Sequence, residues 1–165
     1  MAGRLLISDA NIIIDMNTGG LLRPMFRFDA TFAVPDVLFE EELRADHPEL
    51  VRLGLRVLEL REETILHANG LIEKYRGLGA STNDFLALAL ARQEKCALLT
   101  GDQRLRRAGR TEGVDVHGTL WLIEQMLQAR TINYRQAEAG YGKMRAIGRR
   151  LPWEHVEEQL RRFKQ

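Results

Sequence analysis

Short apolar runs alternate with longer amphipathic segments along most of this chain. Continuous apolar runs are typical of strands that are buried on both faces of a parallel sheet. The run at 55–60 instead alternates apolar and polar residues, which predicts an edge strand. We expect strands at Leu5–Ser8, Thr31–Val34, Leu55–Leu60, Ala97–Leu99 and Val114–Val116. The pattern as a whole predicts an α/β domain with a mostly parallel central sheet.

The segments between and after these strands predict helices. Glu63–Arg76 places apolar residues at close to the 3.6-residue period of an amphipathic helix. Pro35 suits the first turn of a helix that runs to about Ala45, and Pro152 stands where the last helix should begin. Further helices are expected from Ser81 and over 119–128, 133–148 and 153–163. We therefore predict a domain of residues 1–130 with a helical extension of residues 131–165 packed on it.

The composition is that of an ordinary globular protein. Of the 165 residues, 45% are apolar and 28% are charged, which excludes a disordered chain. No apolar run approaches the ~18 residues of a membrane span, and Met1–Asp9 is too short for a signal peptide. Cys96 is the single cysteine and is expected to be a buried core thiol, which points to a reducing compartment. These features predict a cytoplasmic protein without membrane contact.

Charge is distributed unevenly along the chain, although the net charge is only +1. Residues 1–100 carry 11 Lys and Arg against 15 Asp and Glu, whereas residues 101–165 carry 13 against 8. The basic residues are densest at Arg104, Arg106, Arg107 and Arg110. Arginine pairs with phosphate oxygens through two parallel hydrogen bonds, which suits a nucleic-acid surface. A GC-rich genome would enrich arginine equally, so the sequence leaves both explanations open.

Acidic residues stand where the predicted sheet would bind a ligand, beyond the carboxyl ends of its strands. Asp9 directly follows the first strand, and Asp102 follows the fourth. Asp84 stands at the start of the helix before the fourth strand, and Glu40–Glu42 lie in the helix after the second. Each acid alone is more simply a helix cap or a solvated surface charge. The prediction of a site depends on the four positions together.

If these acids converge, they need a cation. Like charges raise each other's pKa, and a divalent ion relieves the repulsion. Oxygen ligands without histidine select Mg²⁺ or Mn²⁺ rather than zinc. Such ions polarise a phosphoryl oxygen and lower the pKa of a bound water. The pattern therefore predicts hydrolysis at phosphorus.

Four blocks of the sequence resemble the PIN-domain nucleases in order and spacing. They are Leu5–Ile12, Val34–Glu41, Asn83–Ala91 and Leu98–Leu105, and the resemblance covers roughly residues 4–125. It implies a three-layer α/β/α fold with a central parallel sheet and an acidic cluster that binds Mg²⁺ or Mn²⁺. Most bacterial single-domain members are VapC-like endoribonuclease toxins. The resemblance therefore also implies an RNA substrate and either an antitoxin partner or a homodimer, and the apolar content of the C-terminal helices, which exceeds what one small core needs, also favours a dimer. A shallow acidic site at the rim of a sheet favours single-stranded RNA, because a duplex cannot bend its phosphates in without distortion.

The resemblance assigns roles to individual acids. Asp9, Asp84 and Asp102 match the first, third and fourth acids of the family and would hold the metal. The second acid is one of three consecutive glutamates. Spacing from the preceding proline favours Glu41, whereas a leucine directly after the acid favours Glu42. Consecutive helical residues point about 100° apart, so only one can face the site squarely. We choose Glu41 as the second acid and as a catalytic residue.

The resemblance also assigns supporting roles around these acids. Asn11 matches a small polar position near the metal, and Thr100 matches a hydroxyl beside the fourth acid. Asp15 is outside the motif and is expected at the surface. We expect phosphate contacts from the arginines that follow the fourth acid, and Lys143, Arg145, Arg149 and Arg150 could also contact RNA. The arginines that follow the fourth acid are Arg104, Arg106, Arg107 and Arg110.

Two other interpretations stay open. A haloacid-dehalogenase-like phosphatase or a response-regulator receiver also has an aspartate after a buried strand. The phosphatase needs a second aspartate where this chain has Asn11, and no lysine follows a late strand as a receiver requires. A PIN fold used only for binding RNA or protein is the other alternative, and the presence of all four acids argues against it.

Overall fold

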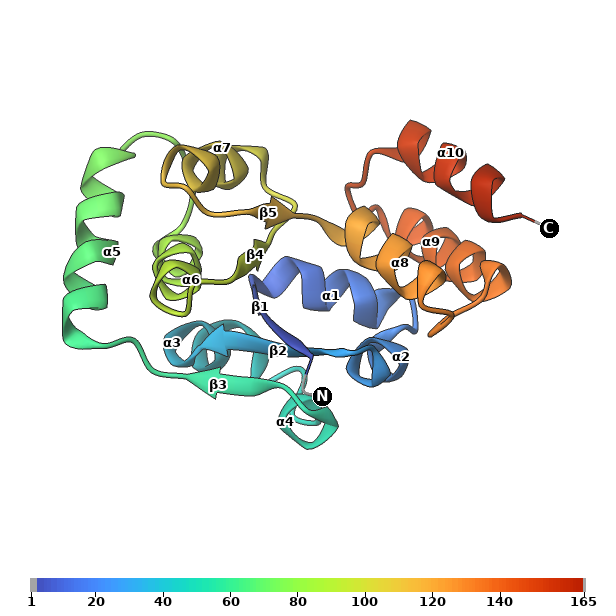
Figure 1. Ribbon diagram of the computed structural model, residues 1–165, viewed down its shortest axis with the longest axis horizontal. Helices are drawn as coiled ribbons and strands as arrows, with labels where there is room; N and C mark the ends of the chain where they lie inside the picture. The colour runs from blue at the N-terminus through green and yellow to red at the C-terminus, as the bar shows by residue number, and fades with distance from the viewer. Residues whose placement is uncertain (1–2, 165) are drawn as a thin grey trace.

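A computed structural model describes residues 3–164, which form a five-stranded sheet flanked by helices (Figure 1). The strand order is β3-β2-β1-β4-β5, and every neighbouring pair is parallel. The strands are β1 (Arg4–Ser8), β2 (Ala30–Pro35), β3 (Arg56–Leu58), β4 (Ala97–Leu99) and β5 (Val116–His117). The predicted α/β/α architecture is confirmed, including the place of β3 at an edge of the sheet.

The two edge strands differ from their predicted bounds. β3 is shorter than 55–60, because the backbone N–H of Leu55 closes the turn after α4 (Leu50–Leu53) by donating to Leu50. β5 begins two residues later than predicted. The N–H of Val114 donates to the carbonyl of Gly109, so Val114 belongs to the turn that leaves the preceding helix. At each edge, residues with a strand-like composition thus form hydrogen bonds within a local turn instead of within the sheet.

The predicted helices are present, and others appear that the sequence patterns do not predict. The predicted ones are α3 (Asp36–Leu38) with its continuation η1 (Phe39–Leu43), α5 (Glu62–Lys74), α6 (Thr82–Gln93), α8 (Thr119–Gln128), α9 (Tyr134–Ile147) and α10 (Trp153–Phe163). The additional ones are α1 (Ala10–Thr18), α2 (Leu22–Arg27), α4 and α7 (Gln103–Thr111). η1 is a π-helical turn, closed by a bond from the N–H of Arg44 to the carbonyl of Phe39.

The helices form two layers around the sheet. α6 packs on β1, β2 and β4, with α5 outside it and α7 on β5. On the opposite face α1 packs against α2, α8 and α9, so the chain ends on that side (Figure 1). The core is fully buried on both sides of the sheet, with Phe32, Leu6 and Ile7 in the strands and Ile12 and Leu88 in the helices.

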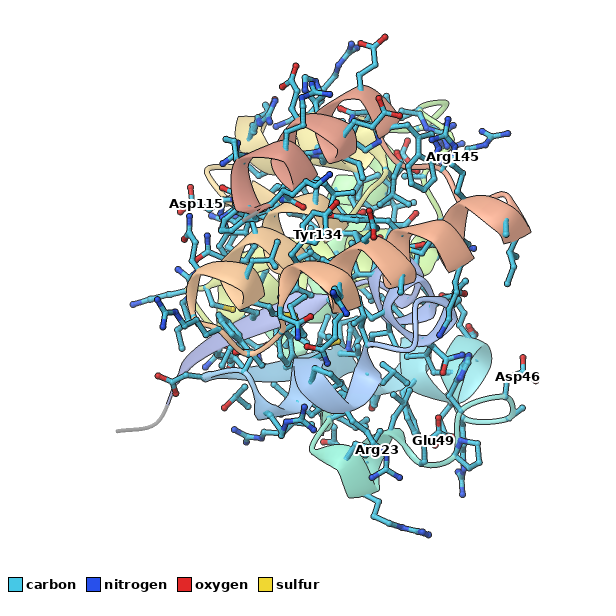
Figure 2. The ribbon with its side chains drawn as sticks, turned by 90° about the vertical axis from the view of Figure 1, so that its right-hand side faces the viewer. Arg23, Asp46, Glu49, Asp115, Tyr134 and Arg145 are labelled. Carbon is cyan, nitrogen blue, oxygen red and sulfur yellow. The ribbon has the colours of Figure 1, made fainter. Side chains whose placement is uncertain are left out.

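The C-terminal helices pack on this domain. α9 lies against α1 and α8, and α10 lies against α8 and α9, as Figure 2 shows with both helices toward the viewer. The buried hydroxyl of Tyr141 donates to Oε1 of Gln159 at 2.5 Å and ties the two helices together. The apolar residues of the extension that are buried in this core are Ile132, Ala137, Tyr141, Met144 and Val156. The apolar content of the extension therefore has an explanation within one chain.

Two further expectations concern the burial of Cys96 and a membrane-spanning helix. Cys96 is only partly buried, contrary to the prediction, because it precedes β4 at the rim of the sheet; partial burial still raises the pKa of its thiol to about 11. Among residues 3–164, no helix combines the length and the apolar character that a membrane span requires.

Candidate active site

The carboxyl edge of the sheet brings the predicted acids to one end of the molecule. Asp9 directly follows β1, Asp102 stands just beyond β4, and η1 continues the helix that follows β2. α6 leads back into the parallel β4, so Asp84 at its start lies toward the same edge. Since parallel strands end together, the topology places these acids on a common rim.

Each of the three aspartates is fixed by the beginning of a helix. Asp9 caps α1 by accepting a hydrogen bond from the N–H of Ile12 at 3.0 Å. Asp102 caps α7 by accepting from the N–H of Arg104 at 2.8 Å, and Asp84 accepts from the N–H of Ser81 in the capping box of α6. These bonds satisfy backbone donors that a helix start leaves free, and they hold the carboxylates in place.

Asp9 is the most deeply placed of the acids, with 1% of its surface exposed. The hydroxyl of Thr100 donates to its Oδ2 at 2.5 Å and accepts from the N–H of Asp102 at 3.2 Å, so Thr100 links the two aspartates. Burial raises the pKa of Asp9 to about 7, against the lowering effect of the bonds from Thr100 and Ile12. The charges of Asp84 and Asp15 are smaller contributions to the same increase in pKa. Within residues 3–164, no cationic side chain forms an ion pair with Asp9.

Asp102 has the opposite electrostatic environment. Partial burial acts to raise its pKa, but hydrogen bonds from the side chain of Arg104 and from the backbone of Leu105 and Arg104 outweigh burial and lower it. The guanidinium of Arg104 pairs with Oδ2 at 3.2 Å. Asp102 is therefore held as a charged carboxylate, whereas Asp9 retains a proton more readily. Thr100 links Asp9 and Asp102, and a bound cation would balance the charge of their carboxylate oxygens.

Two of the three consecutive glutamates contact the same side chain. Glu40 turns away to pair with Arg44, whereas the side-chain amide of Asn83 donates to both Glu41 and Glu42, at 3.3 and 2.9 Å. The π-helical turn explains this, because its wider ring makes consecutive side chains diverge less than in an α-helix. Both glutamates thus reach the residue next to Asp84, and this contact does not distinguish Glu41 from Glu42.

The donor set fits a hard divalent cation. It consists of carboxylate and hydroxyl oxygens, and its most buried member has no cationic partner to balance its charge. As the side chains are placed, no three acidic, histidine or cysteine groups in the described part of the chain are close enough to share one ion directly. Mg²⁺ binds through one or two carboxylates and keeps several waters, so a spread set of acids around a hydrated ion is compatible with its chemistry.

The four predicted arginines take different positions on α7. Arg104 lines a cleft together with Asp102. Arg107 and Arg110 are exposed along the helix and do not line that cleft. Arg106 is partly buried, and its Nε has no hydrogen-bond partner within residues 3–164; burial and the charge of Arg110 lower its pKa. Of the four, Arg104 lies nearest to the acids.

The cleft beside Asp102 also contains residues that sequence reasoning misses. Its volume is about 900 Å³, and Asn11, Asp15 and the loop 148–152 line it together with residues 101–104. Asp15 is 6% exposed, so its predicted surface position is wrong. It accepts hydrogen bonds from the hydroxyl of Thr119 at 2.7 Å and from Nε of Arg149 at 2.6 Å. One sequence signal was available, since Asp15 interrupts the apolar run from Ile12 to Met16.

Comparison with known families agrees with this geometry. A family model described as a PIN domain matches residues 5–165, which includes the C-terminal helices. No curated protein matches the chain.

Proposed function

We propose that this chain, which belongs to the PIN-domain family, is an endoribonuclease that uses Mg²⁺ or Mn²⁺ to cleave single-stranded RNA. PIN domains are generally nucleases, so the family itself indicates phosphodiester cleavage. The observation that carries the proposal is the environment of Asp9, a buried carboxylate that is bonded to Thr100, is affected by the charge of Asp84 and has no cationic partner among residues 3–164. Such a carboxylate is costly to keep charged unless a cation binds it.

The acids have distinct roles in this proposal. Asp9, Asp84 and Asp102 would hold the ion, and Thr100 fixes two of them relative to each other. A bound divalent ion polarises a phosphoryl oxygen and lowers the pKa of a water molecule. Glu41, which shares the amide of Asn83 with its neighbour, would orient the attacking water.

The single cysteine is not placed to act as a nucleophile at this edge. Cys96 precedes β4 and therefore lies at the amino end of the sheet, away from the acids. Burial also raises the pKa of its thiol to about 11, which leaves little of the reactive thiolate at neutral pH. The attacking group is therefore expected to be water.

A single strand is the favoured substrate because the acids stand at the rim of a sheet. Asp9 is almost completely buried and is bonded to Thr100, so a phosphate must bend toward the rim to come near it. A flexible strand can do so, whereas a duplex must first be distorted. We also propose a cytoplasmic location, where RNA is present and a single free cysteine stays reduced.

The experiment measures cleavage of labelled single-stranded and duplex RNAs in Mn²⁺ or in EDTA. The wild type is compared with Asp9→Asn and with Asp46→Asn, a matched loss of an exposed charge at the periphery (Figure 2). We expect cleavage of the single strand by the wild type and by Asp46→Asn in Mn²⁺ only, and none by Asp9→Asn. Cleavage that persists in EDTA or in Asp9→Asn refutes the mechanism. Binding of RNA without cleavage, across varied sequences, favours the non-catalytic alternative.

The finer assignment is that the protein is a VapC-like toxin with an antitoxin partner, and that it forms a homodimer. A protein-contact surface is supported by α5, which exposes the neighbouring side chains of Ile65 and Leu66. Induced expression should arrest growth in the wild type and not in Asp9→Asn. Light scattering, with Leu66→Gln as the comparison, tests the dimer, and a monomer at high concentration contradicts it.

A further inference from the structure

The C-terminal extension supplies one wall of the cleft beside Asp102. Residues 101–104 at the start of α7 form one side, and the loop 148–152 between α9 and α10 forms another. Asn11 and Asp15 of α1 complete the lining. Because Asn11 is two residues from Asp9, the loop 148–152 adjoins the candidate active site.

Within that loop, Arg149 is held by two residues of α1. Its Nε donates to Oδ1 of Asp15 at 2.6 Å, and its Nη2 lies 3.3 Å from Oδ1 and 3.4 Å from the carbonyl oxygen of Asn11. The other carboxylate oxygen of Asp15 accepts from the hydroxyl of Thr119. Asp15 is therefore fixed from two sides, and it fixes the guanidinium in turn.

These bonds leave part of the guanidinium free to bind a ligand. Arginine has five N–H donors in a planar fork, and Nη1 of Arg149 makes no hydrogen bond to any residue of 3–164. The side chain is 26% exposed, and it lines the cleft. A partly exposed guanidinium with free donors matches the geometry of a phosphate.

We propose that Arg149 binds a backbone phosphate of the RNA and that Asp15 is the residue that positions it. The inference rests on the proposed nuclease function and names the substrate group that the C-terminal loop contacts. Arg104 lies on the α7 side of the same cleft, so the two arginines would hold the strand from different sides.

The charges of the cleft favour this assignment. An acidic edge repels a polyanion, so the strand needs cations beside the acids. Arg104 is paired with Asp102, and Arg149 with Asp15, so both stay in place without substrate. An arginine that is already fixed loses little conformational freedom when a phosphate binds. The exposed Arg150 adds a further positive charge on the same loop.

The experiment separates substrate binding from a purely structural role. Binding of a single-stranded RNA is measured on the Asp9→Asn background as a function of salt, and kcat and KM are measured with Asp9 intact. The variants are Arg149→Met, Arg149→Lys and Asp15→Asn. The matched control is Arg23→Met, which removes an exposed arginine of α2, labelled in Figure 2.

We expect Arg149→Met to raise the Kd about tenfold. The slope of log K against log salt should fall in magnitude by about 1, which corresponds to the loss of one phosphate contact. KM should rise while kcat at saturating RNA stays within about threefold, because the acids are untouched. Arg149→Lys should keep the salt slope but weaken binding, since it keeps the charge and loses the fork. Asp15→Asn should weaken binding less than Arg149→Met, and Arg23→Met should behave as the wild type.

The outcomes distinguish this inference from the function on which it rests. If the wild type cleaves RNA and the Arg149 variants match Arg23→Met in Kd, KM and salt slope, the inference is overturned and the nuclease assignment stands. If they lose only thermal stability, Arg149 is a structural anchor and the inference is likewise overturned. If the wild type binds RNA through Arg149 but cleaves none, the nuclease assignment fails and the phosphate contact stands. Should Arg149→Met not fold, Arg149→Lys decides by the same criteria.

Discussion

Replacing Asp9 with asparagine should remove a pH-dependent destabilisation of the metal-free protein. Burial raises the pKa of the folded carboxyl from 3.8 to about 7, so the folded state binds this proton more tightly than the unfolded state. Stability is then highest below the ordinary pKa and falls as pH rises from about 4 to about 7. The difference between the two pKa values corresponds to about 4 kcal/mol, of which about 2–3 kcal/mol is lost between pH 5 and pH 8.

The assay is urea unfolding in EDTA at pH 5 and pH 8 for the wild type, Asp9→Asn and the control Asp46→Asn. The change in pH dependence is the informative quantity, because asparagine also has a pH-independent effect on packing. The free energy of unfolding of Asp9→Asn minus that of the wild type should be about 2–3 kcal/mol larger at pH 8 than at pH 5. If the stabilities of the wild type and Asp9→Asn change in parallel with pH, Asp9 is not a buried acid with a raised pKa and the electrostatic argument is refuted.

Adding a divalent ion extends the same assay to the proposed cofactor. Mg²⁺ or Mn²⁺ that binds only the folded state stabilises it by about 2.7 kcal/mol when the free ion is at 100 times its Kd. The wild type at pH 8 should gain such stability, and Asp9→Asn should not. Equal stabilisation of both proteins would place the ion elsewhere.

Two further predictions concern the link between the aspartates and the docking of α9. Thr100→Val removes the hydroxyl that donates to Asp9, so the pKa of Asp9 should rise further and the acid limb of the pH–rate profile should move to higher pH, at a stability cost of about 1–3 kcal/mol. Gly140→Ala should destabilise by about 1–3 kcal/mol, because a Cβ there would lie 2.8 Å from Leu21 and 3.1 Å from the carbonyl of Gly19. Gly142→Ala, which meets open space on the same helix, should stabilise by up to about 1 kcal/mol, and equal effects of the two alanines in thermal unfolding would contradict the packing argument.

The inner strands were predictable because strands that are buried on both faces of a parallel sheet have continuous apolar runs, here separated by helical segments. Leu6 and Ile7 are fully buried on β1, as Leu98 and Leu99 are on β4. The position of Asp9 follows from the same pattern, since it stands directly after β1, and Asp102 stands shortly after β4. The sequence therefore locates the carboxyl edge as soon as it locates the sheet.

Two helices beside the site were not predictable from local patterns. α1 contains three consecutive isoleucines, Ile12–Ile14, and β-branched residues favour strands. α7 is rich in arginine and has few apolar positions, of which Leu105 and Ala108 are buried. In both cases an aspartate cap and tertiary packing determine the helix, and neither effect has a periodic signal in the sequence.

The partner of Asp15 was beyond the reach of the sequence for a different reason. Arg149 is 134 residues away, and its pairing depends on how α9 packs against α1. An aspartate within an apolar run signals that a buried polar partner exists, because an unpaired charge there is costly. The identity of the partner requires the fold.

For each aspartate, a role at the start of a helix and a role as a metal ligand are compatible in this structure. Asp9 and Asp102 cap α1 and α7, Asp84 belongs to the capping box of α6, and these bonds hold the three carboxylates at the carboxyl edge of the sheet. The positive ends of three helices point to the same edge, which also favours a phosphate there. Asparagine caps a helix about as well as aspartate, whereas alanine does not. Aspartate-to-asparagine changes therefore remove the charge and keep the cap, and comparison with the alanine variants assigns each loss of function to one role or the other.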